Sequence, residues 1–599
     1  MKIKIFKISF LIVLSVIFLS CEDLLDKEPN NYDSVGFYQS EAAVKSGVTG
    51  IYNLLYIGGL HPYPTVLDMD TPLCLDRTEN TTIGAGGAIN PDNSTLKTWW
   101  TAQYRIIARA NSVLTGVQPY LENLSGKSTQ YLAEAKVLRA YAYYNLISFF
   151  GDVPFFTESI TIEQYKAERE DKGVILDFIL DEFEAAATDL PWMASERGRV
   201  DKSVAYGLKA RAAMLGGSLN YSEKANDYFQ IAATAAETIF GHRALADNFE
   251  DLFNKTGQMK EDVRDEMLFE LMFSDKGSTK WHWANFGRVS RNYGQTGKHP
   301  SQLIVDTYEC IDGKRIDESP LYDPQNPFKN RDPRLRFTIY MHGDTVVGNT
   351  NGTDSGRIKF ILDAYNPTTL FYNFTTGEWD SGINADINSG AAWTSFANAG
   401  VGYLWKKWTY ETVETVRNST YNIPILRFAE VLLTYAEAKI ELNELDASVY
   451  DAINEVRNRS GMPNVSVDRI GSQEKMRQLV RREQKVEFID EGLHLIDMRR
   501  WKTGDIENDS PSYGFPVAQS YDENGYIKTG GYADVTPDMI PDFKKSVRHD
   551  LNDIASYDAY KEKLKVRDKN RFWDDKFYLF PIPQEERDRD SNLTQNEGY

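Results

Sequence analysis

The sequence predicts a mainly α-helical protein, a superhelical scaffold of tetratricopeptide-like helical pairs with long loop-rich insertions and little β structure. Three observations predict this fold. Several stretches repeat apolar residues every three or four positions, the spacing of one helix face. Some of these stretches occur in adjacent pairs joined by short turns, as in a helical hairpin. Between them lie long segments rich in Gly, Asn, Asp, Thr and Pro, the composition of loops.

The first twenty residues have the pattern of a signal peptide. Three lysines precede an apolar run over residues 8–19, which is too short to cross a bilayer and ends at Ser20, just before Cys21. This junction resembles the bacterial lipobox, in which the cysteine is lipidated, although Phe18 stands where leucine is usual. We expect residues 1–20 to be removed and acyl chains on Cys21 to hold the protein on a membrane surface. An ordinary secretory signal is the alternative.

The remaining residues, 21–599, are expected to form a single domain built on five amphipathic stretches. In the first, Leu132, Leu138 and Leu146 lie on one stripe that also carries alanines. Alanines at such positions let two helices approach closely. The five predicted helical stretches are residues 131–150, 202–220, 223–240, 428–442 and 449–456. The segments 61–98, 277–300 and 343–420 are predicted to be ordered loops, because they are rich in aromatic residues as well as in turn formers.

Charge and motifs exclude several classes of function. The formal net charge is −20, which repels polyanions and argues against a nucleic-acid partner. None of the seven histidines has a neighbour at metal-ligand spacing, so neither a metal nor a cofactor is expected. The stretch 384–390 spaces its polar residues like a calcium loop but lacks the glycine and glutamate positions of an EF-hand. Ser472 heads an S-x-x-K match but is interpreted as a helix cap. Cys74 and Cys310 could pair or remain free.

The densest cluster of charge lies in residues 481–501. Glu483 and Glu487 are one helical turn apart and close in sequence to Arg482, Arg499 and Arg500. Like charges at this spacing repel unless arginines bridge them, and arginine neighbours lower the pKa of a carboxyl group. The pattern therefore favours a buried ion-pair network over a catalytic pair of carboxylates.

Six blocks of sequence, in order, resemble one known family. They are CEDLLDKEP after the signal peptide, WWTAQYRIIARANSVL with LAEAKVLRAYAYYNLISFFGDVPFF, NPFKNRDPRLRFTIY, IPILRFAEVLLTYAEAKIELNE, the VRRE…EG…DMRRW segment, and the closing FPIPQEERDRDSNLTQNEGY. Together they are similar to the RagB/SusD family of outer-membrane nutrient-binding lipoproteins, over the whole of residues 21–599. Departures are modest: His494 stands where most members carry arginine, and the chain ends in tyrosine where tryptophan is common.

The resemblance implies both fold and function. It implies tetratricopeptide-like helical pairs, with an N-terminal part over residues 21–245 and a C-terminal part over 246–599. It implies a lipid-anchored protein on the cell surface that covers a TonB-dependent, SusC-like transporter in the outer membrane. It also implies binding of an oligosaccharide, or in some members a peptide, without catalysis and without a cofactor. The family's shared blocks do not carry its ligand residues, so these are nominated from the residues themselves.

A sugar-binding site needs exposed aromatic rings beside fixed polar groups. The stretch KWHWANFGRVSRNYGQTGKHP best meets this criterion, with Trp379 and Trp393 in the later loop and a third group in the early loop next. The ten candidate ligand-binding residues are Trp281, Trp283, Asn285, Arg288, Tyr293, Trp379, Trp393, Tyr63, Asp70 and Arg77. The alternative is that the tryptophans only pin loops to the scaffold. Trp100, Tyr403, Trp405 and Trp408 are predicted to be structural instead.

Three functions remain open from the sequence. The leading hypothesis is a surface receptor that captures a glycan and passes it to a transporter. A receptor for peptides or protein fragments on the same scaffold is the second. An extracellular glycoside hydrolase is the third, and a retaining enzyme of this class would need two carboxylates about 5 to 5.5 Å apart, one of them with a raised pKa.

Overall fold

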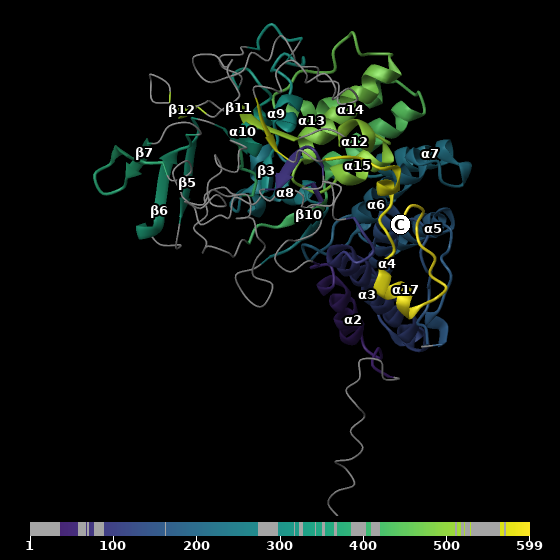
Figure 1. The fold of residues 1–599 in the computed structure, drawn as a ribbon. Coiled ribbons are helices and arrows are strands. Elements are labelled where there is room, and N and C mark those ends of the chain that lie inside the picture. The colour runs from purple at the N-terminus through teal and green to yellow at the C-terminus, as the bar shows by residue number, and fades with distance from the viewer. Residues whose placement is uncertain are drawn as a thin grey trace, which may run out of the picture.

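The fold is described from a computed structural model of the full chain (Figure 1). The described residues are 36–57, 67–68, 71–76, 89–161, 163–273, 298–316, 318–322, 328–341, 343–349, 354–363, 368–384, 403–408, 420–508, 512–516, 520–521, 527–528, 564–567 and 571–599.

Helices of about three and a half to seven turns form the frame. The long ones are α2 (Glu41–Asn53), α3 (Ser94–Val117), α4 (Gly126–Phe150), α5 (Lys172–Asp189), α6 (Lys202–Ser218), α7 (Ala225–Glu237), α12 (Phe428–Glu441), α13 (Ala447–Arg459) and α14 (Gln473–Phe488). Shorter ones are α8 (Glu261–Glu266), α9 (Gln302–Thr307), α10 (Pro333–Thr338), α15 (His494–Arg500), α16 (Gly504–Glu507) and α17 (Gln584–Arg589). The predicted mainly α-helical scaffold of helical pairs is confirmed, and all five predicted helical stretches lie in α4, α6, α7, α12 and α13.

Neighbouring helices in the sequence pack against each other, as in a superhelix of pairs. The helices α3 to α7 follow one another in contact, and α12 joins them by packing on α6 and α7 (Figure 1). Gly216 and Gly217 make the contact of α6 with its neighbours close, since an added Cβ would lie 2.3 Å from Leu176 and 2.5 Å from Phe229. One hydrophobic core therefore runs through helices on both sides of residue 245.

The helix α4 is the centre of that core. Every residue from Tyr131 to Phe150 is buried except Lys136. Its predicted apolar stripe is correct, but the other faces of the helix are covered as well. Tyr143 donates to the carbonyl of Phe156 (2.9 Å), and Arg139 Nε donates to Glu182 Oε2 (2.8 Å), which satisfies two of the polar groups that this burial encloses.

Short antiparallel strands connect or extend the frame. They are β1 (Cys74–Asp76), β2 (Phe269–Leu271), β3 (Lys298–Pro300), β4 (Ile339–Tyr340), β9 (Leu404–Trp405), β10 (Ile423–Leu426), β11 (Ser512–Pro516), β12 (Ser520–Tyr521), β13 (Ile527–Lys528) and β14 (Leu564–Arg567). They form two-stranded pairs, β1 with β3, β2 with β10, β4 with β9, β11 with β14 and β12 with β13. These pairs agree with the prediction of little β structure.

One larger sheet lies where a long loop was predicted. Within the segment 343–420, the strands β5 (Thr345–Asn349), β6 (Arg357–Ile361), β7 (Thr368–Asn373) and β8 (Glu378–Ile383) form an antiparallel sheet in that order. In Figure 1 this sheet extends from the body at the side opposite to α5 and α7, and far from α2. The loop prediction was wrong for these four strands. It was also wrong for the short strands β1, β3 and β9 and for the first turn of α3, which begins at Ser94 within the predicted loop 61–98.

Several smaller predictions can be checked directly. The side chain of Ser472 accepts from the backbone of Lys475, so it caps α14 as predicted. Cys74 and Cys310 are both buried, and no disulfide joins them. None of the described helices is long and apolar enough to cross a membrane.

Candidate functional site

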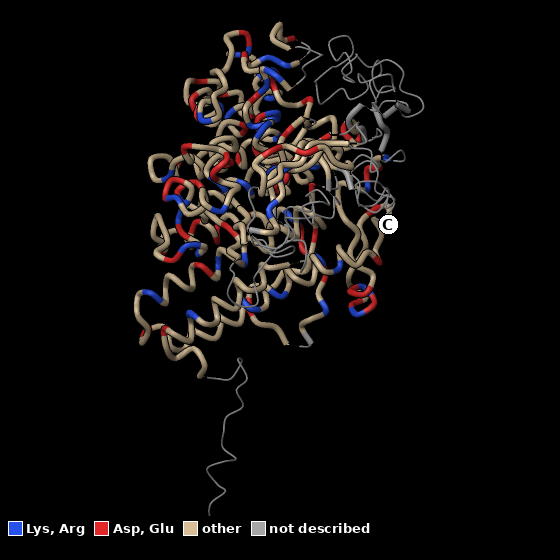
Figure 2. Tube along the Cα trace, turned by 90° about the vertical axis from the view of Figure 1, so that its left-hand side faces the viewer, with Lys and Arg blue, Asp and Glu red and all other residues tan. Residues whose placement is uncertain are grey.

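The carboxylates of residues 481–501 belong to a buried ion-pair cluster. Glu487 lies on α14 and is fully buried, with Arg334 (3.0 Å), Arg427 (2.9 Å) and Arg459 (2.5 Å) as its partners. Glu483, one turn earlier, pairs with Arg334 (2.5 Å) and Arg457 (2.9 Å). Lys and Arg lie interspersed with Asp and Glu through the helical frame (Figure 2). The predicted ion-pair network is therefore confirmed for these two residues.

This cluster does not have the electrostatics of an acid catalyst. Burial alone would raise the pKa of Glu487, but Arg459, Arg427 and Arg334 outweigh it and hold that pKa well below the usual range. A general acid needs the opposite, a carboxyl whose pKa is raised toward neutrality. Glu487 is also shielded from any substrate, because it is fully buried. Its role is structural.

The β5–β8 sheet has one face on the body and one face toward solvent. The inner face carries Val346, Phe360 and Phe371, which pack with Tyr340 and Leu404. Because side chains alternate along a strand, the strand register fixes which residues lie on the other side. We call that side the outer face. Its described members include Val347, Arg357, Lys359, Leu370, Tyr372, Phe374, Trp379 and Ile383.

Three aromatic rings gather on the outer face. Tyr372 is opposite Trp379 in the register, and their ring centroids are 5.5 Å apart at an interplanar angle of 72°. Phe374 lies 5.1 Å from Tyr372 at 80°. Trp379 is 38% exposed, Leu370 is 45% exposed and the neighbouring rim residue Ile383 is 74% exposed. Apolar surface of this kind marks a site of interaction when its members are contiguous.

The turn between β7 and β8 holds these rings in place. The side chain of Asn373 accepts from the backbone of Thr375 (3.0 Å) and Thr376 (3.2 Å), an Asx turn. Gly377 then adopts φ of +79°, a left-handed conformation that glycine takes without strain, and its N–H donates to the Asn373 carbonyl (2.8 Å). The sequence NFTTGE thus closes a tight hairpin, which keeps Phe374 and Trp379 beside Tyr372.

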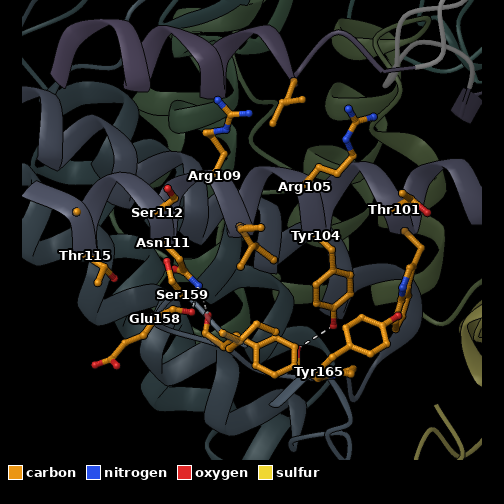
Figure 3. Close-up of a pocket in the computed structure, with 18 of the residues that line it drawn as sticks. Thr101, Tyr104, Arg105, Arg109, Asn111, Ser112, Thr115, Glu158, Ser159 and Tyr165 are labelled. Atoms are coloured by element: carbon orange, nitrogen blue, oxygen red, sulfur yellow. Dashed lines mark hydrogen bonds between the residues drawn. The ribbon is translucent and has the colours of Figure 1, made fainter. Parts of the chain in front are cut away.

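A second candidate site is an open groove of about 950 Å³ beside α3 (Figure 3). Its walls are mostly apolar and include Trp100, Ile107 and Phe156. Its buried polar groups already have partners: Tyr104 donates to the Pro154 carbonyl (2.8 Å), and Asn111 donates to the Phe156 (3.0 Å) and Glu158 (2.9 Å) carbonyls. Sugar hydroxyls would have to bind at the exposed polar side chains of the rim, so the apolar walls fit an apolar partner surface better than a glycan.

Figure 3 also shows the rim of this groove. The guanidinium groups of Arg105 and Arg109 extend from one side of α3, while Tyr104 and Asn111 point to the other. Both arginines are exposed. Gly36, the first described residue of the chain, lines the same groove.

The structure describes one of the ten nominated ligand residues. Trp379 is exposed on the outer face of the sheet, with two further aromatic rings beside it. The other nine lie outside the described residues; they are Trp281, Trp283, Asn285, Arg288, Tyr293, Trp393, Tyr63, Asp70 and Arg77. Cys21, the predicted lipidation site, does too. Asn384 is described, and its side chain donates to the Asp363 carbonyl (2.8 Å).

The tryptophans predicted to be structural are buried, as expected. Trp100, Trp405 and Trp408 are each less than 5% exposed, and so is Tyr403. Tyr372 and Phe374 were not among the residues predicted from the sequence to bind ligand. No alternation of apolar and polar residues marks them, because LFYNF carries apolar residues on both faces of the strand.

Comparison with known families decides what kind of protein this is. A model described as the SusD family matches residues 265–599, more than half of the chain. The chain belongs to the SusD family. A second model, described as starch-binding associating with outer membrane, matches residues 23–214.

Relatives of this SusD-family protein have the same extent. A SusD-like protein of Formosa agariphila is 23% identical over 504 residues, 80% of this chain and 87% of the relative. Another protein of that organism is 22% identical over 83% of this chain and 92% of its own length. Identity at this level does not show which ligand this protein binds, but the shared length shows that the similarity extends over most of the chain.

Solved structures share the fold. A SusD-like carbohydrate-binding protein of Bacteroides fragilis superposes with a TM-score of 0.72 at 24% identity, covering 93% of this chain and 100% of its own. A protein described as a laminarin-binding SusD-like protein has a TM-score of 0.55 at 19% identity, covering 94% of this chain and 100% of its own. Two of these family members are thus described as binding carbohydrate.

Proposed function

We propose that this SusD-family protein is a non-catalytic, lipid-anchored receptor on the outer face of the outer membrane, which captures a glycan and delivers it to a SusC-like, TonB-dependent transporter. Family membership and the lipobox-like Cys21 support the location. The observation that carries the binding function is the exposed aromatic cluster of Trp379, Tyr372 and Phe374. Rings held rigidly at a surface stack on the apolar faces of sugars.

Two features of the structure support binding without turnover. The most concentrated group of carboxylates is buried and paired with arginines, which opposes its use as an acid catalyst. The outer face of the sheet has no pair of carboxylates among its described residues, because Glu378 and Asp380 are opposite Asn373 and Phe371 on the other face. A retaining or inverting hydrolase needs such a pair on either side of the scissile bond.

The groove beside α3 is the better candidate for the contact with the transporter. Gly36 lines it and comes about fifteen residues after Cys21, so the proposed anchor lies within about 50 Å along the chain. Figure 1 shows α2 at one end of the molecule and the β5–β8 sheet near the other. In this arrangement the groove side faces the membrane while the aromatic face is presented to ligand.

Glycan binding is tested by affinity electrophoresis and calorimetry of the mature protein against a panel of neutral and acidic glycans, together with peptides and a reducing-sugar assay. We expect binding without turnover. Trp379→Ala should weaken it by about tenfold or more, the loss typical of an aromatic anchor. Phe572→Ala, which removes another exposed aromatic ring, is the matched control and should have no effect.

Two outcomes would count against the proposed function, and a third would move the binding site. Release of reducing sugar at enzyme-like rates would show a hydrolase, and binding of peptides alone would show the second type of receptor. Binding that survives Trp379→Ala but is lost in Trp281→Ala or Trp283→Ala would keep the function and move the site to residues 280–300.

A further inference from the structure

We infer that the outer face of the β5–β8 sheet selects an acidic oligosaccharide, one whose sugars carry carboxylate groups as uronic acids do. The inference rests on the proposed function, since it names the class of glycan that the aromatic cluster would capture. Three observations carry it: the cations that contact the rings, the absence of acids on the same face among the described residues of the four strands, and an arginine placed over a ring.

Each aromatic ring of the outer face has a cation against it. Lys359 Nζ lies 4.7 Å from the centroid of Tyr372 and 5.3 Å from that of Trp379. The guanidinium carbon of Arg357 lies 4.5 Å from the centroid of Phe374. Arg357 and Lys359 are two residues apart on β6, so about 7 Å separates their backbone positions along one row. The site therefore offers two positive charges beside three rings.

No acid shares that face among the described residues of the four strands. Glu378 and Asp380 are the only described carboxylates in these strands, and the register turns both to the inner side. Asp380 accepts from Asn373 there (3.0 Å). No ion pair forms between Arg357 or Lys359 and any described carboxylate. In a chain with 87 acids and 67 lysines and arginines, a face with cations alone is a local reversal of charge.

The contacts leave the cations able to bind an anion. A guanidinium stacked over a ring keeps its N–H donors at its edge, where a planar carboxylate fits with two parallel hydrogen bonds. Lys359 offers a compact charge and three donors. A neutral sugar would use the rings but not the charges. A uronic acid uses both, because its pyranose face stacks on a ring while its carboxylate meets the cation.

The test compares ligands that differ in charge alone. Oligogalacturonate and its methyl ester share one backbone, and oligomannuronate with its methyl ester provides a second pair. Calorimetry with the mature protein at 50 mM NaCl should show the acidic member of at least one pair binding about tenfold or more tightly than its ester. The preference should shrink at 500 mM NaCl, because salt screens exposed charges.

Variants of the two cations test whether the preference for acidic ligands arises at this face of the sheet. Arg357→Gln and Lys359→Gln should each remove about tenfold of affinity for the acidic ligand and leave the ester unchanged. Lys359→Arg keeps the charge and should retain the preference. The matched control is Glu378→Gln, a neutralised carboxylate on the opposite face of the same sheet, which should not weaken binding. Circular dichroism of each variant shows that the sheet still folds.

The outcomes separate this inference from the proposed function. Binding of esters or other neutral glycans as tightly as of acids, or an acid preference that survives both Gln variants, overturns the inference and leaves glycan capture intact. Binding of poly-L-glutamate through Arg357 and Lys359 with no binding of uronates would show an acidic protein as the partner, and also overturns it. No binding of any glycan, acidic or neutral, overturns the proposed function itself.

Discussion

Replacing Glu487 by glutamine should destabilise the protein strongly while keeping its shape. Glu487 is fully buried and accepts from Arg334, Arg427 and Arg459 at 2.5 to 3.0 Å. The connected cluster around it holds seven cations and six carboxylates, so the substitution raises its net charge from +1 to +2. Removing one partner of a buried pair costs about 3–5 kcal/mol.

That cost translates into a measurable melting shift. The unfolding entropy is about 2.1 cal/mol/K per residue, which is about 1.3 kcal/mol/K for the 599 residues of the chain. Tm should therefore fall by about 2–4 °C in differential scanning calorimetry at pH 7. Glu184→Gln is the matched control, since Glu184 is half-exposed and pairs with Lys209 at 2.6 Å. Surface pairs contribute about 0–1 kcal/mol, so its Tm should change by less than about 1 °C.

The pH dependence provides the sharper test. The pKa of Glu487 in the folded protein lies below the value of about 4.3 for an unfolded glutamate, because the arginines outweigh the effect of burial. Its stabilisation is therefore complete above about pH 4.3 and is lost as the pH falls toward the folded-state pKa. Glutamine has no such loss, so the stability gap between wild type and variant should narrow by about 1.4 kcal/mol per pH unit below pH 4.3. A gap that stays constant from pH 7 to pH 3, or equal Tm values at pH 7, would refute the reasoning.

Two further predictions concern the core. Gly504→Ala should lower the unfolding free energy by about 1–3 kcal/mol, because the added Cβ would lie 2.1 Å from the Trp573 ring. A fall in Tm no larger than that of the surface control Glu184→Gln would contradict this. Cys74 and Cys310 are fully buried, and burial raises the pKa of Cys310. In a protein that begins after Cys21, neither should react with a maleimide in the native state, whereas both should react in guanidinium. Labelling of the native protein at neutral pH would contradict this.

The helical frame could be predicted because its residues separate cleanly by face. In α7, Phe229, Ala232 and Ala236 are buried while Gln230 is exposed, so the spacing of three and four is visible in the sequence. The ion-pair cluster was also predicted from the arginines near Glu483 and Glu487, but those arginines have other partners, since Arg482 pairs with Glu309 and Arg500 with Glu437. Its partners from other segments, such as Arg334 and Arg427, could not be assigned, because sequence proximity does not show which distant strands and helices meet.

The β5–β8 sheet was missed for a physical reason. A strand is recognised by apolar residues on alternate positions, which requires a polar outer face. Here the outer face carries Val347, Leu370 and Trp379 opposite an inner face with Val346 and Phe360, so the alternation disappears. The property that makes this face a candidate site therefore also hides the strands from pattern analysis. Trp379 was nominated from its type and its loop-like context, without its neighbours Tyr372 and Lys359.

The strand order of this sheet has a consequence for how copies of the protein meet. The strand β8 is at the end of the order β5-β6-β7-β8, so half of its backbone hydrogen-bonding groups face outward. An exposed edge can recruit a strand from a second molecule, and the apolar outer face would add to that attraction. Glu378 and Asp380 place two exposed negative charges on this edge strand. Two copies brought edge to edge would repel through these carboxylates, so the sheet can keep an apolar outer face without pairing its edge with that of a second copy.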